Sequence, residues 1–180
     1  KWAEWEANPK PYGGMGALAK IREAKESGAT RLVLAINKIT DLTPLAELTN
    51  LTGLNLGTNI TIIDLTPLAG LTSLTFLNLA DNNVTDLTPL AGLTNMESLW
   101  FRGNEITDLT PLAGLTNLER LNLFNNQITD LTPLAGLTKL IEMRLFNNPI
   151  TDLAPLAGMT ELKKLNLSNN QITDLTPLAG

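Results

Sequence analysis

A block of the form LTxLxxLxLxxNxITDLTPLAG recurs every 22 residues and fills Leu71–Gly180 with five consecutive copies. Repetition at such a period is typical of a solenoid, in which each unit packs against its neighbours because it cannot bury its apolar face alone. Positions that stay constant between copies are therefore expected to build the scaffold. Positions that vary without loss of the frame are expected to form the surface that meets other molecules.

The same frame continues towards the N-terminus. Residues 48–70 form a unit with one extra residue, and residues 26–47 form a degenerate unit that keeps Leu32, Leu34 and Asn37. We assign residues 1–25 to an N-terminal segment and cap helix, and the rest of the single domain to seven units: 26–47, 48–70, 71–92, 93–114, 115–136, 137–158 and 159–180.

Each unit carries signals for two short elements. Leucine pairs such as Leu77 and Leu79 alternate with outward residues, which predicts a short strand, and successive units would stack these strands into a parallel sheet. An asparagine follows each strand, where its amide can satisfy backbone groups of its own and adjacent units. The Thr-Pro pair predicts a 3₁₀ turn, with threonine at the N-cap and proline at the first helical position. The expected fold is an α/β repeat solenoid, a right-handed superhelix with a concave parallel sheet and convex 3₁₀ turns.

The two ends differ from this pattern. Met15, Leu18, Ile21 and Ala24 recur at steps of three between Gly14 and Gly28, which predicts an amphipathic helix that caps the apolar N-terminal end. Residues 159–180 form a regular unit, so we expect the C-terminal cap to be missing and that edge to be open to self-association.

Composition excludes several classes of site. The chain has no cysteine and no histidine, which removes Cys/His zinc sites, disulfides and catalytic dyads built on imidazole or thiolate. Gly13-Gly14-Met15-Gly16 is too short for a phosphate loop and lacks its lysine. No apolar run reaches the roughly 18–20 residues of a membrane span. We therefore expect no enzyme, no cofactor and no membrane span in these residues.

One aspartate per unit forms a column that could suggest a calcium site. Each aspartate precedes a helical turn, where a carboxylate can accept hydrogen bonds from free backbone amides. The column also lacks the clustered six to eight oxygens, roughly, that calcium takes. We interpret it as a capping column with no metal; its members are Asp41, Asp64, Asp86, Asp108, Asp130, Asp152 and Asp174.

The leucine ladder, the asparagine column and the Thr-Asp-Leu-Thr-Pro-Leu segment of residues 26–180 resemble the leucine-rich repeats of bacterial internalins. This resemblance implies a curved, rigid module that recognises a protein through its concave face; internalins are surface proteins that engage host receptors. Residues 21–30, in contrast, look more like the junction of helix and first strand in intracellular bacterial leucine-rich-repeat proteins, including those fused to Roco GTPase domains. A cell-surface and a cytoplasmic location both stay open.

The outward positions of the strands suggest a binding site. Asparagine is the default between the two strand leucines, and Trp100 and Arg144 break it. Exposed Trp, Phe and Arg carry most of the energy of protein interfaces, although scattered apolar surface residues can also arise by chance. We predict a partner-binding patch made of the large residues that gather on the third to sixth units: Phe76, Trp100, Arg102, Arg120, Phe124, Arg144 and Phe146.

Charge on this face points to the kind of partner. The outward positions hold six cations against three acids, a balance of 6 − 3 = +3 on a chain of net charge −5. This favours a protein partner with an acidic surface. Separated cations do not form the dense basic stripe that nucleic acid needs. We expect a non-catalytic protein–protein interaction module; the alternative is a structural or regulatory arm of a larger GTPase, kinase or effector.

Overall fold

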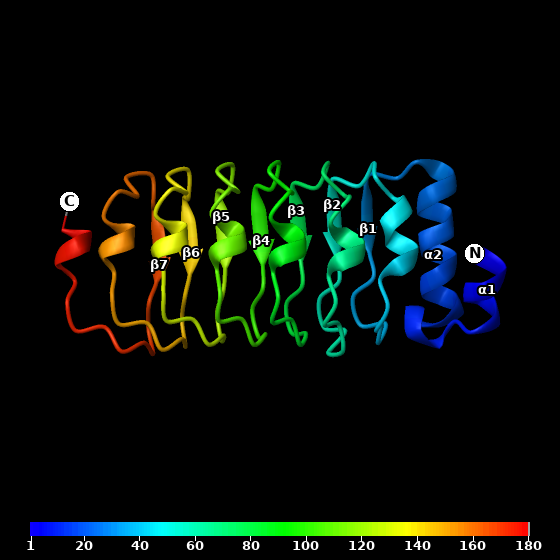
Figure 1. Ribbon diagram of the computed structural model, residues 1–180, viewed down its shortest axis with the longest axis horizontal. Coiled ribbons are helices and arrows are strands. Elements are labelled where there is room, and N and C mark those ends of the chain that lie inside the picture. The colour runs from blue at the N-terminus through cyan, green and yellow to red at the C-terminus, as the bar shows by residue number, and fades with distance from the viewer. Residues whose placement is uncertain (180) are drawn as a thin grey trace.

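The computed structural model describes residues 1–179 and arranges the strands in one row, in sequence order (Figure 1). All neighbouring strands are parallel, which confirms the predicted sheet. The strands are β1 (Arg31–Val33), β2 (Gly53–Asn55), β3 (Phe76–Asn78), β4 (Ser98–Trp100), β5 (Arg120–Asn122), β6 (Glu142–Arg144) and β7 (Lys164–Asn166).

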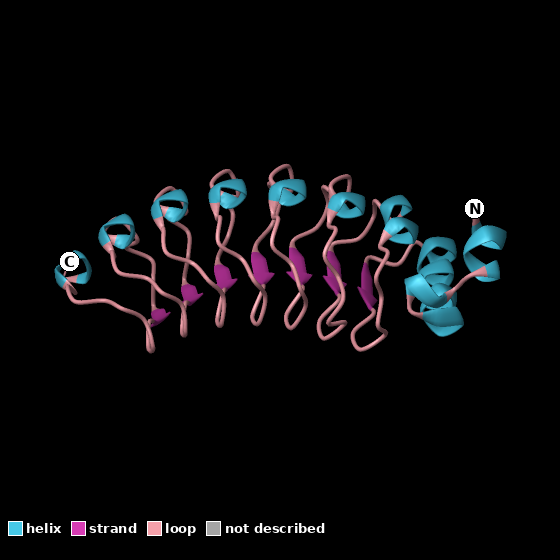
Figure 2. Cartoon of the chain, turned by 60° about the horizontal axis from the view of Figure 1, so that its bottom comes forward, coloured by secondary structure: helices cyan, strands magenta, loops and turns pink. Residues whose placement is uncertain are grey.

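Short 3₁₀ turns alternate with the strands along the chain. They lie on the outer side of an arc whose inner side carries the strands (Figure 2). Strands pack about 4.8 Å apart, and helical turns need more room, so the layer of turns curves around the sheet. The predicted solenoid with a concave sheet is confirmed. The turns are η2 (Thr43–Glu47), η3 (Thr66–Leu68), η4 (Thr88–Leu90), η5 (Thr110–Leu112), η6 (Thr132–Leu134), η7 (Ala154–Leu156) and η8 (Thr176–Leu178).

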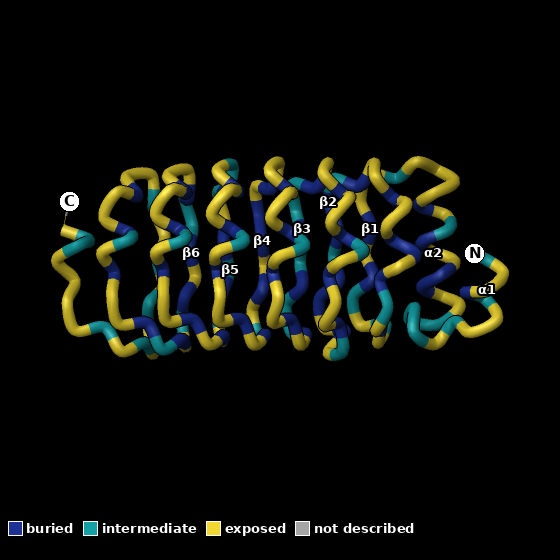
Figure 3. Tube along the Cα trace, viewed as in Figure 1, coloured by how far each residue is buried: buried dark blue, intermediate teal, exposed yellow. Residues whose placement is uncertain are grey.

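Leucine fills the space between the two layers. Leu77 and Leu79 are completely buried on either side of the outward Asn78. The buried positions repeat from unit to unit as far as Met159 and become only partly buried in the last unit (Figure 3). Each fully buried leucine contributes roughly 1.5–3 kcal/mol of transfer free energy. The fourth unit places Phe101 at a leucine position, where the ring is also completely buried.

The buried asparagines connect each unit to the one before it. Nδ2 of Asn126 donates to the carbonyl oxygens of Leu123 and Phe101, both at 3.0 Å. Oδ1 of the same side chain accepts from the N–H of Ile106 at 3.1 Å. One amide thus satisfies backbone groups in two adjacent units, as the sequence predicted.

The extra residue of the second unit interrupts this pattern once. Asn82 makes the same donor contacts, to the carbonyl oxygens of Leu56 and Leu79. Its Oδ1, however, is buried without a hydrogen-bond partner. By analogy with Asn126 the donor would be the N–H of Ile62, and the insertion ahead of Ile62 displaces it. The longer unit therefore leaves one buried acceptor unpaired.

The 3₁₀ turns begin one residue earlier than expected. In η4 the first residue is Thr88, proline follows it, and Leu87 holds the N-cap position. The prediction of threonine at the N-cap is therefore wrong. The capping hydrogen bond comes from Asp86, whose Oδ1 accepts from the Thr88 N–H at 2.8 Å. The aspartate one residue before the N-cap serves the role that the sequence reasoning gave to threonine.

Three helical segments precede the first strand: α1 (Trp2–Ala7), η1 (Lys10–Tyr12) and α2 (Gly14–Ser27). The predicted cap helix is confirmed as α2, which packs on β1 and η2. It buries Ala17 together with Leu18, Ile21 and Ala24. Met15 is 53 % exposed, so its predicted place in the buried stripe was wrong. Ala17 is buried instead, because a helix turns once every 3.6 residues and a step of three drifts off the buried face.

We expect the replacement Asn126→Ala to lower the free energy of unfolding by about 1–3 kcal/mol more than Asn82→Ala does. Both variants lose the same donor contacts, but only Asn126→Ala also strips the acceptor from a buried N–H. Equilibrium urea denaturation of the two variants and the wild type measures the difference. Equal losses in both variants would show that the Oδ1 bond contributes nothing.

Candidate protein-binding groove

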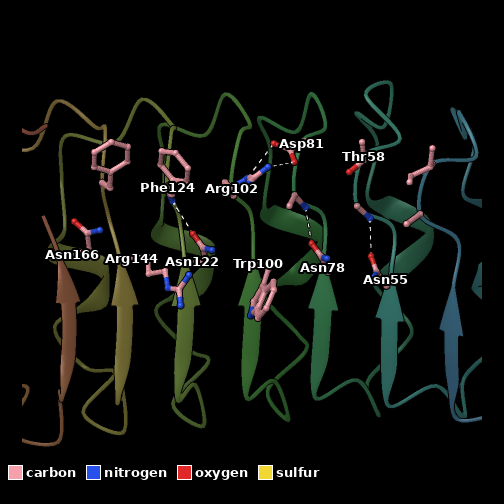
Figure 4. Close-up of a pocket in the computed structure, with 15 residues that line it drawn as sticks. Asn55, Thr58, Asn78, Asp81, Trp100, Arg102, Asn122, Phe124, Arg144 and Asn166 are labelled. Carbon is pink, nitrogen blue, oxygen red and sulfur yellow. Dashed lines mark hydrogen bonds and ion pairs between the residues drawn. The ribbon is translucent and has the colours of Figure 1, made fainter. Parts of the chain in front are cut away.

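Strand register places the two departures from the asparagine default on either side of one strand. Trp100 of β4 pairs with Asn122 of β5, and Asn122 pairs with Arg144 of β6. The two large side chains therefore flank a small one on the concave face (Figure 4). Trp100 is 42 % exposed, and its Nε1 donates to Oγ of Ser98 at 3.0 Å, which fixes the orientation of the indole.

The aromatic residues of the predicted patch form two pairs. Phe76 meets Trp100 edge to face, with ring centroids 5.9 Å apart and an interplanar angle of 68°. Phe124 and Phe146 lie 4.7 Å apart at 54°. Aromatic pairs of this geometry contribute about 0.5–1.5 kcal/mol beyond their buried area, so each pair holds its rings in place before any partner arrives.

The arginines of the patch are held by carboxylates of the same chain. Arg102 forms a two-pronged contact with Asp81, at 2.7 Å and 3.3 Å, and its guanidinium lies 5.9 Å from the ring centre of Phe124. Arg144 donates to Glu142 at 2.7 Å. These pairs fix the planes of the guanidinium groups and neutralise part of their charge.

A groove of about 610 Å³ runs along the concave face. It is lined by five of the seven predicted residues: Trp100, Arg102, Phe124, Arg144 and Phe146. Arg120 lines a smaller hollow of about 230 Å³ together with Trp100 and Arg144. Phe76 lines neither and supports Trp100 from the side. The structure thus brings six of the predicted residues to two adjoining hollows and places the seventh behind them.

Sequence reasoning missed the other end of this groove. The lining continues across β3 and β2 to Ala35, Ile36 and Thr58, just beyond the first two strands. Ile36 is 76 % exposed, and Val33 beside it on β1 is 60 % exposed. The sequence pattern predicts only that the first unit has lost some of its leucines, and it does not indicate that outward aliphatic residues of this unit line the groove.

A backbone column gives the signal that would have found them. The residue before each buried asparagine adopts a left-handed conformation, with φ between 54° and 65°. Glycine, asparagine and aspartate accept this conformation readily, whereas it costs other residues roughly 1–2 kcal/mol. The third to seventh units place aspartate, glycine or asparagine at this position, whereas the first two units place a β-branched residue there. The residues of the column are Ile36, Thr58, Asp81, Gly103, Asn125, Asn147 and Asn169.

The asparagine default between the strand leucines also has a structural cause. Oδ1 of Asn78 accepts from the N–H of Ala80 at 2.9 Å, and Oδ1 of Asn122 accepts from the N–H of Phe124 at 3.2 Å. Asn55 and Asn166 make the same contact two residues further on. Each asparagine thus caps the backbone where it leaves the sheet.

Three units give up this cap, those with Val33, Trp100 and Arg144 in the asparagine position. In these units the backbone N–H group two residues further on lacks a hydrogen-bond acceptor within residues 1–179. The three groups are those of Ala35, Arg102 and Phe146. A typical hydrogen bond contributes about 0.5–1.5 kcal/mol. The large or apolar side chains at these positions therefore replace a stabilising contact. Trp100 and Arg144 line the groove, and Val33 stands two residues before its lining residue Ala35.

Ion pairs compensate part of the positive charge that the sequence predicted for the concave face. Arg102, Arg120 and Arg144 each have a carboxylate within 4 Å, and Lys164 lies 3.9 Å from Glu142. Among the described residues, the two concave cations without such a partner are Arg31 and Lys38. The uncompensated charge of the concave face lies at its N-terminal end, away from the aromatic patch.

The aspartate column acts as a set of caps on the convex side. The hydroxyl and the backbone N–H of the following threonine lower the pKa of Asp64, Asp86, Asp108 and Asp130, and the backbone N–H of Thr176, followed by its hydroxyl, lowers that of Asp174. Within residues 1–179, no three acidic side chains gather closely enough to hold a metal ion. The hydrogen bonds confirm the capping interpretation.

The sequence also predicted that the chain has no membrane span and that its C-terminal edge is open to self-association. In residues 1–179 no helix has the length and apolar character needed to cross a membrane. At the last strand Leu165 and Leu167 are only partly buried. Self-association at this edge stays a prediction.

Comparison with known proteins gives two kinds of match. The family model for leucine-rich repeats in two copies matches residues 72–114, 94–136 and 138–180. Among solved structures, the chain is similar to an internalin (InlF) of Listeria monocytogenes, with a TM-score of 0.82 and 41 % identity over 86 % of this chain and 46 % of that one. It is also similar to internalin C2 of the same organism, with a TM-score of 0.72 and 35 % identity over 96 % of this chain and 89 % of that one.

No curated protein matches the sequence. The chain spans about half the length of InlF. The resemblance of residues 21–30 to intracellular leucine-rich-repeat proteins is tested by neither structural match and stays a prediction.

We expect the stability of the protein to fall as the pH drops below the ordinary aspartate value of about 3.9. Carboxylates whose pKa is lowered by folding stabilise the native state above that value, and this contribution is lost as they are protonated. The triple variant Asp86→Asn, Asp108→Asn and Asp130→Asn should show a flatter decline of Tm between about pH 4 and pH 2.

The matched control replaces three exposed glutamates with glutamine, at positions 26, 105 and 161, which removes the same charge without touching a cap. This control should decline as steeply as the wild type. An equally steep decline in the aspartate variant would contradict the role of the column.

Proposed function

Because the chain belongs to the bacterial leucine-rich-repeat proteins of the internalin type, we propose that it binds a partner protein through the concave face of its sheet. Proteins with this repeat serve as protein-interaction modules, and the proposal concerns where the contact is made. The binding site consists of the groove residues Trp100, Arg102, Phe124, Arg144 and Phe146, with Arg120 and Phe76 at its side.

One observation carries the proposal. Trp100 and Arg144 stand where four of the other units place an asparagine that caps the backbone. The resulting loss of hydrogen bonds brings no gain in core packing, since both side chains are exposed. Departures that weaken the fold without improving its core are expected at functional sites. These two lie beside the aromatic pairs, in a groove.

The chemistry of the groove suits a mixed apolar and polar epitope. Trp100 and the Phe124–Phe146 pair present ring faces and edges that are already ordered, so little conformational entropy is lost when a partner covers them. Arg102 and Arg144 keep donors beyond those used by Asp81 and Glu142, because a guanidinium has five N–H groups. A partner surface with carboxylates or carbonyl oxygens among apolar side chains would use both sets of groups.

The alternative function is a repeat arm that spaces or regulates other domains of a larger protein. It is compatible with the same fold, and the concave residues would then be incidental. It does not account for the coincidence of lost backbone caps, aromatic pairs and groove on four adjacent units, the third to the sixth. Concave binding is therefore the function that the geometry supports best.

We expect the double variant Trp100→Ala/Phe124→Ala to lose capture of the partner protein in a pull-down from a lysate. Tm should fall only slightly, from the loss of the two aromatic pairs, because both side chains lie outside the core. The matched control, Met15→Ala/Ile63→Ala, removes two exposed apolar side chains that do not line the groove, and it should keep the wild-type partner. Binding that survives the double variant, or that fails equally in the control, would contradict the proposal.

A further inference from the structure

The groove has two chemically different ends. The aromatic end over β4–β6 is the proposed binding site. The other end, beside β1 and β2, carries aliphatic side chains: Ala35 and Ile36 line it together with Thr58, and the exposed Val33 of β1 stands two residues before Ala35. Here too the sequence departs from the repeat in ways that weaken the fold.

Two departures coincide at the aliphatic end. Val33 takes the place of the capping asparagine and leaves the N–H of Ala35 without its usual acceptor. Ile36 occupies the left-handed column at φ 63°, where a β-branched side chain is strained. Neither residue gains burial in return, since they are 60 % and 76 % exposed. Both would be better replaced by asparagine if stability alone mattered.

Unpaired positive charge surrounds this end. Arg31 and Lys38 have no carboxylate within 4 Å among residues 1–179. The side chain of Arg31 lies across Gly53 of β2; a Cβ at that glycine would come within 3.2 Å of its Cγ. The glycine therefore lets Arg31 lie flat on the concave surface. An occupant of this end would combine aliphatic side chains with carboxylates.

The floor between the two ends is a row of free amide donors. Oδ1 of Asn55, Asn78 and Asn122 is used to cap the backbone, so each Nδ2 remains a donor, and none has an acceptor within residues 1–179. Figure 4 shows Asn55 and Asn78 on neighbouring strands and Asn122 beyond Trp100. Neighbouring strands place the donors of Asn55 and Asn78 about 4.8 Å apart, and the donor of Asn122 lies two strands beyond Asn78. Carbonyl oxygens of an extended backbone are acceptors that such amide donors can bind.

From these features we propose, building on the concave-face function above, that the groove takes an extended segment of the partner protein. The segment runs across the strands and lays aliphatic side chains, flanked by carboxylates, over β1 and β2. Its other end reaches the aromatic patch. Five strand spacings of about 4.8 Å separate β1 from β6, and an extended chain rises about 3.3 Å per residue, so roughly seven residues bridge the groove.

The test begins with a display library of random 12-residue peptides selected on the immobilised full chain. Selected peptides should carry leucine, isoleucine or valine next to Asp or Glu. A synthetic peptide of the most enriched sequence, labelled with a fluorophore, then serves as the probe for Kd measurements by fluorescence anisotropy on every variant. If no peptide is enriched, the occupant is a folded surface and the proposal of an extended segment is overturned.

The first variant is Val33→Asn/Ile36→Asn. It restores the backbone cap and relieves the left-handed strain, so Tm should rise by about 2–4 °C, while the Kd of the peptide should increase at least tenfold. A rise in Tm with unchanged Kd would overturn the role of the aliphatic end. A fall in Tm would show that these residues support the fold instead.

The second variant is Asn78→Asp, in which Oδ1 still caps the N–H of Ala80 but the donor facing the groove is gone. We expect at least tenfold weaker peptide binding with Tm nearly unchanged. Asn83→Asp adds the same charge at an exposed position outside the groove lining and is the matched control. Equal effects of the two substitutions would mean that charge alone, and not the row of donors, sets the affinity.

Failure of this inference can be told apart from failure of the proposed function. A peptide that loses affinity only in Trp100→Ala/Phe124→Ala leaves concave binding intact and overturns the role of β1 and β2. Peptides that bind equally well to all groove variants overturn both.

Discussion

The buried asparagine that joins each unit to the one before it is the interaction on which the rest of the structure depends. The backbone turns sharply where it leaves each strand, and the turn would leave carbonyl and N–H groups buried without partners. Asn126 satisfies groups of its own unit and of the preceding one, so the spacing of the units is fixed by hydrogen bonds as well as by leucine packing. The unpaired oxygen of Asn82 shows what a single inserted residue does to this arrangement.

A second row of asparagines lies on the concave face, and it gives most units the same polar side chain at the same position. Asn78 and its equivalents cap the backbone and present a free amide, which makes most of the concave face polar and uniform. Departures from that default can therefore be interpreted in energetic terms, because each one removes a known hydrogen bond. Val33, Trp100 and Arg144 are such departures; Trp100 and Arg144 line the groove, and Val33 stands two residues before the lining residue Ala35. Stability lost at these positions is most simply explained by binding.

The sequence alone predicted the architecture well, because a repeat of fixed period determines strand register directly. Once Leu77 and Leu79 are aligned with their equivalents, the rows of outward residues follow, and the patch around Trp100 could be assembled without coordinates. The threonine cap was misplaced by one residue because aspartate and threonine are both good caps, and only geometry shows which oxygen meets the free N–H. Met15 was misplaced because a step of three drifts away from the buried face of an α-helix.

Other features needed three dimensions. The left-handed backbone conformation at Ile36 cannot be inferred from the residue type alone. It becomes evident only because every unit has this conformation at the equivalent position. The pairing of Arg102 with Asp81 depends on side chains of adjacent units, and it moved the uncompensated charge from the aromatic patch to Arg31 and Lys38. Sequence reasoning thus located one end of the groove and its net charge, but not the distribution of that charge or the second end.

The central claim is that the concave departures from the repeat exist to bind a partner. Amide hydrogen exchange followed by NMR tests it most directly at three N–H groups, those of Ala35, Arg102 and Phe146, which lack the cap found in the other units. In the free protein these amides should exchange faster than their capped equivalents at Ala80 and Phe124. With the bound segment present they should become protected, while the amides of the convex turns stay unchanged. Protection confined to the convex turns, or no difference between capped and uncapped amides in the free protein, would contradict the account.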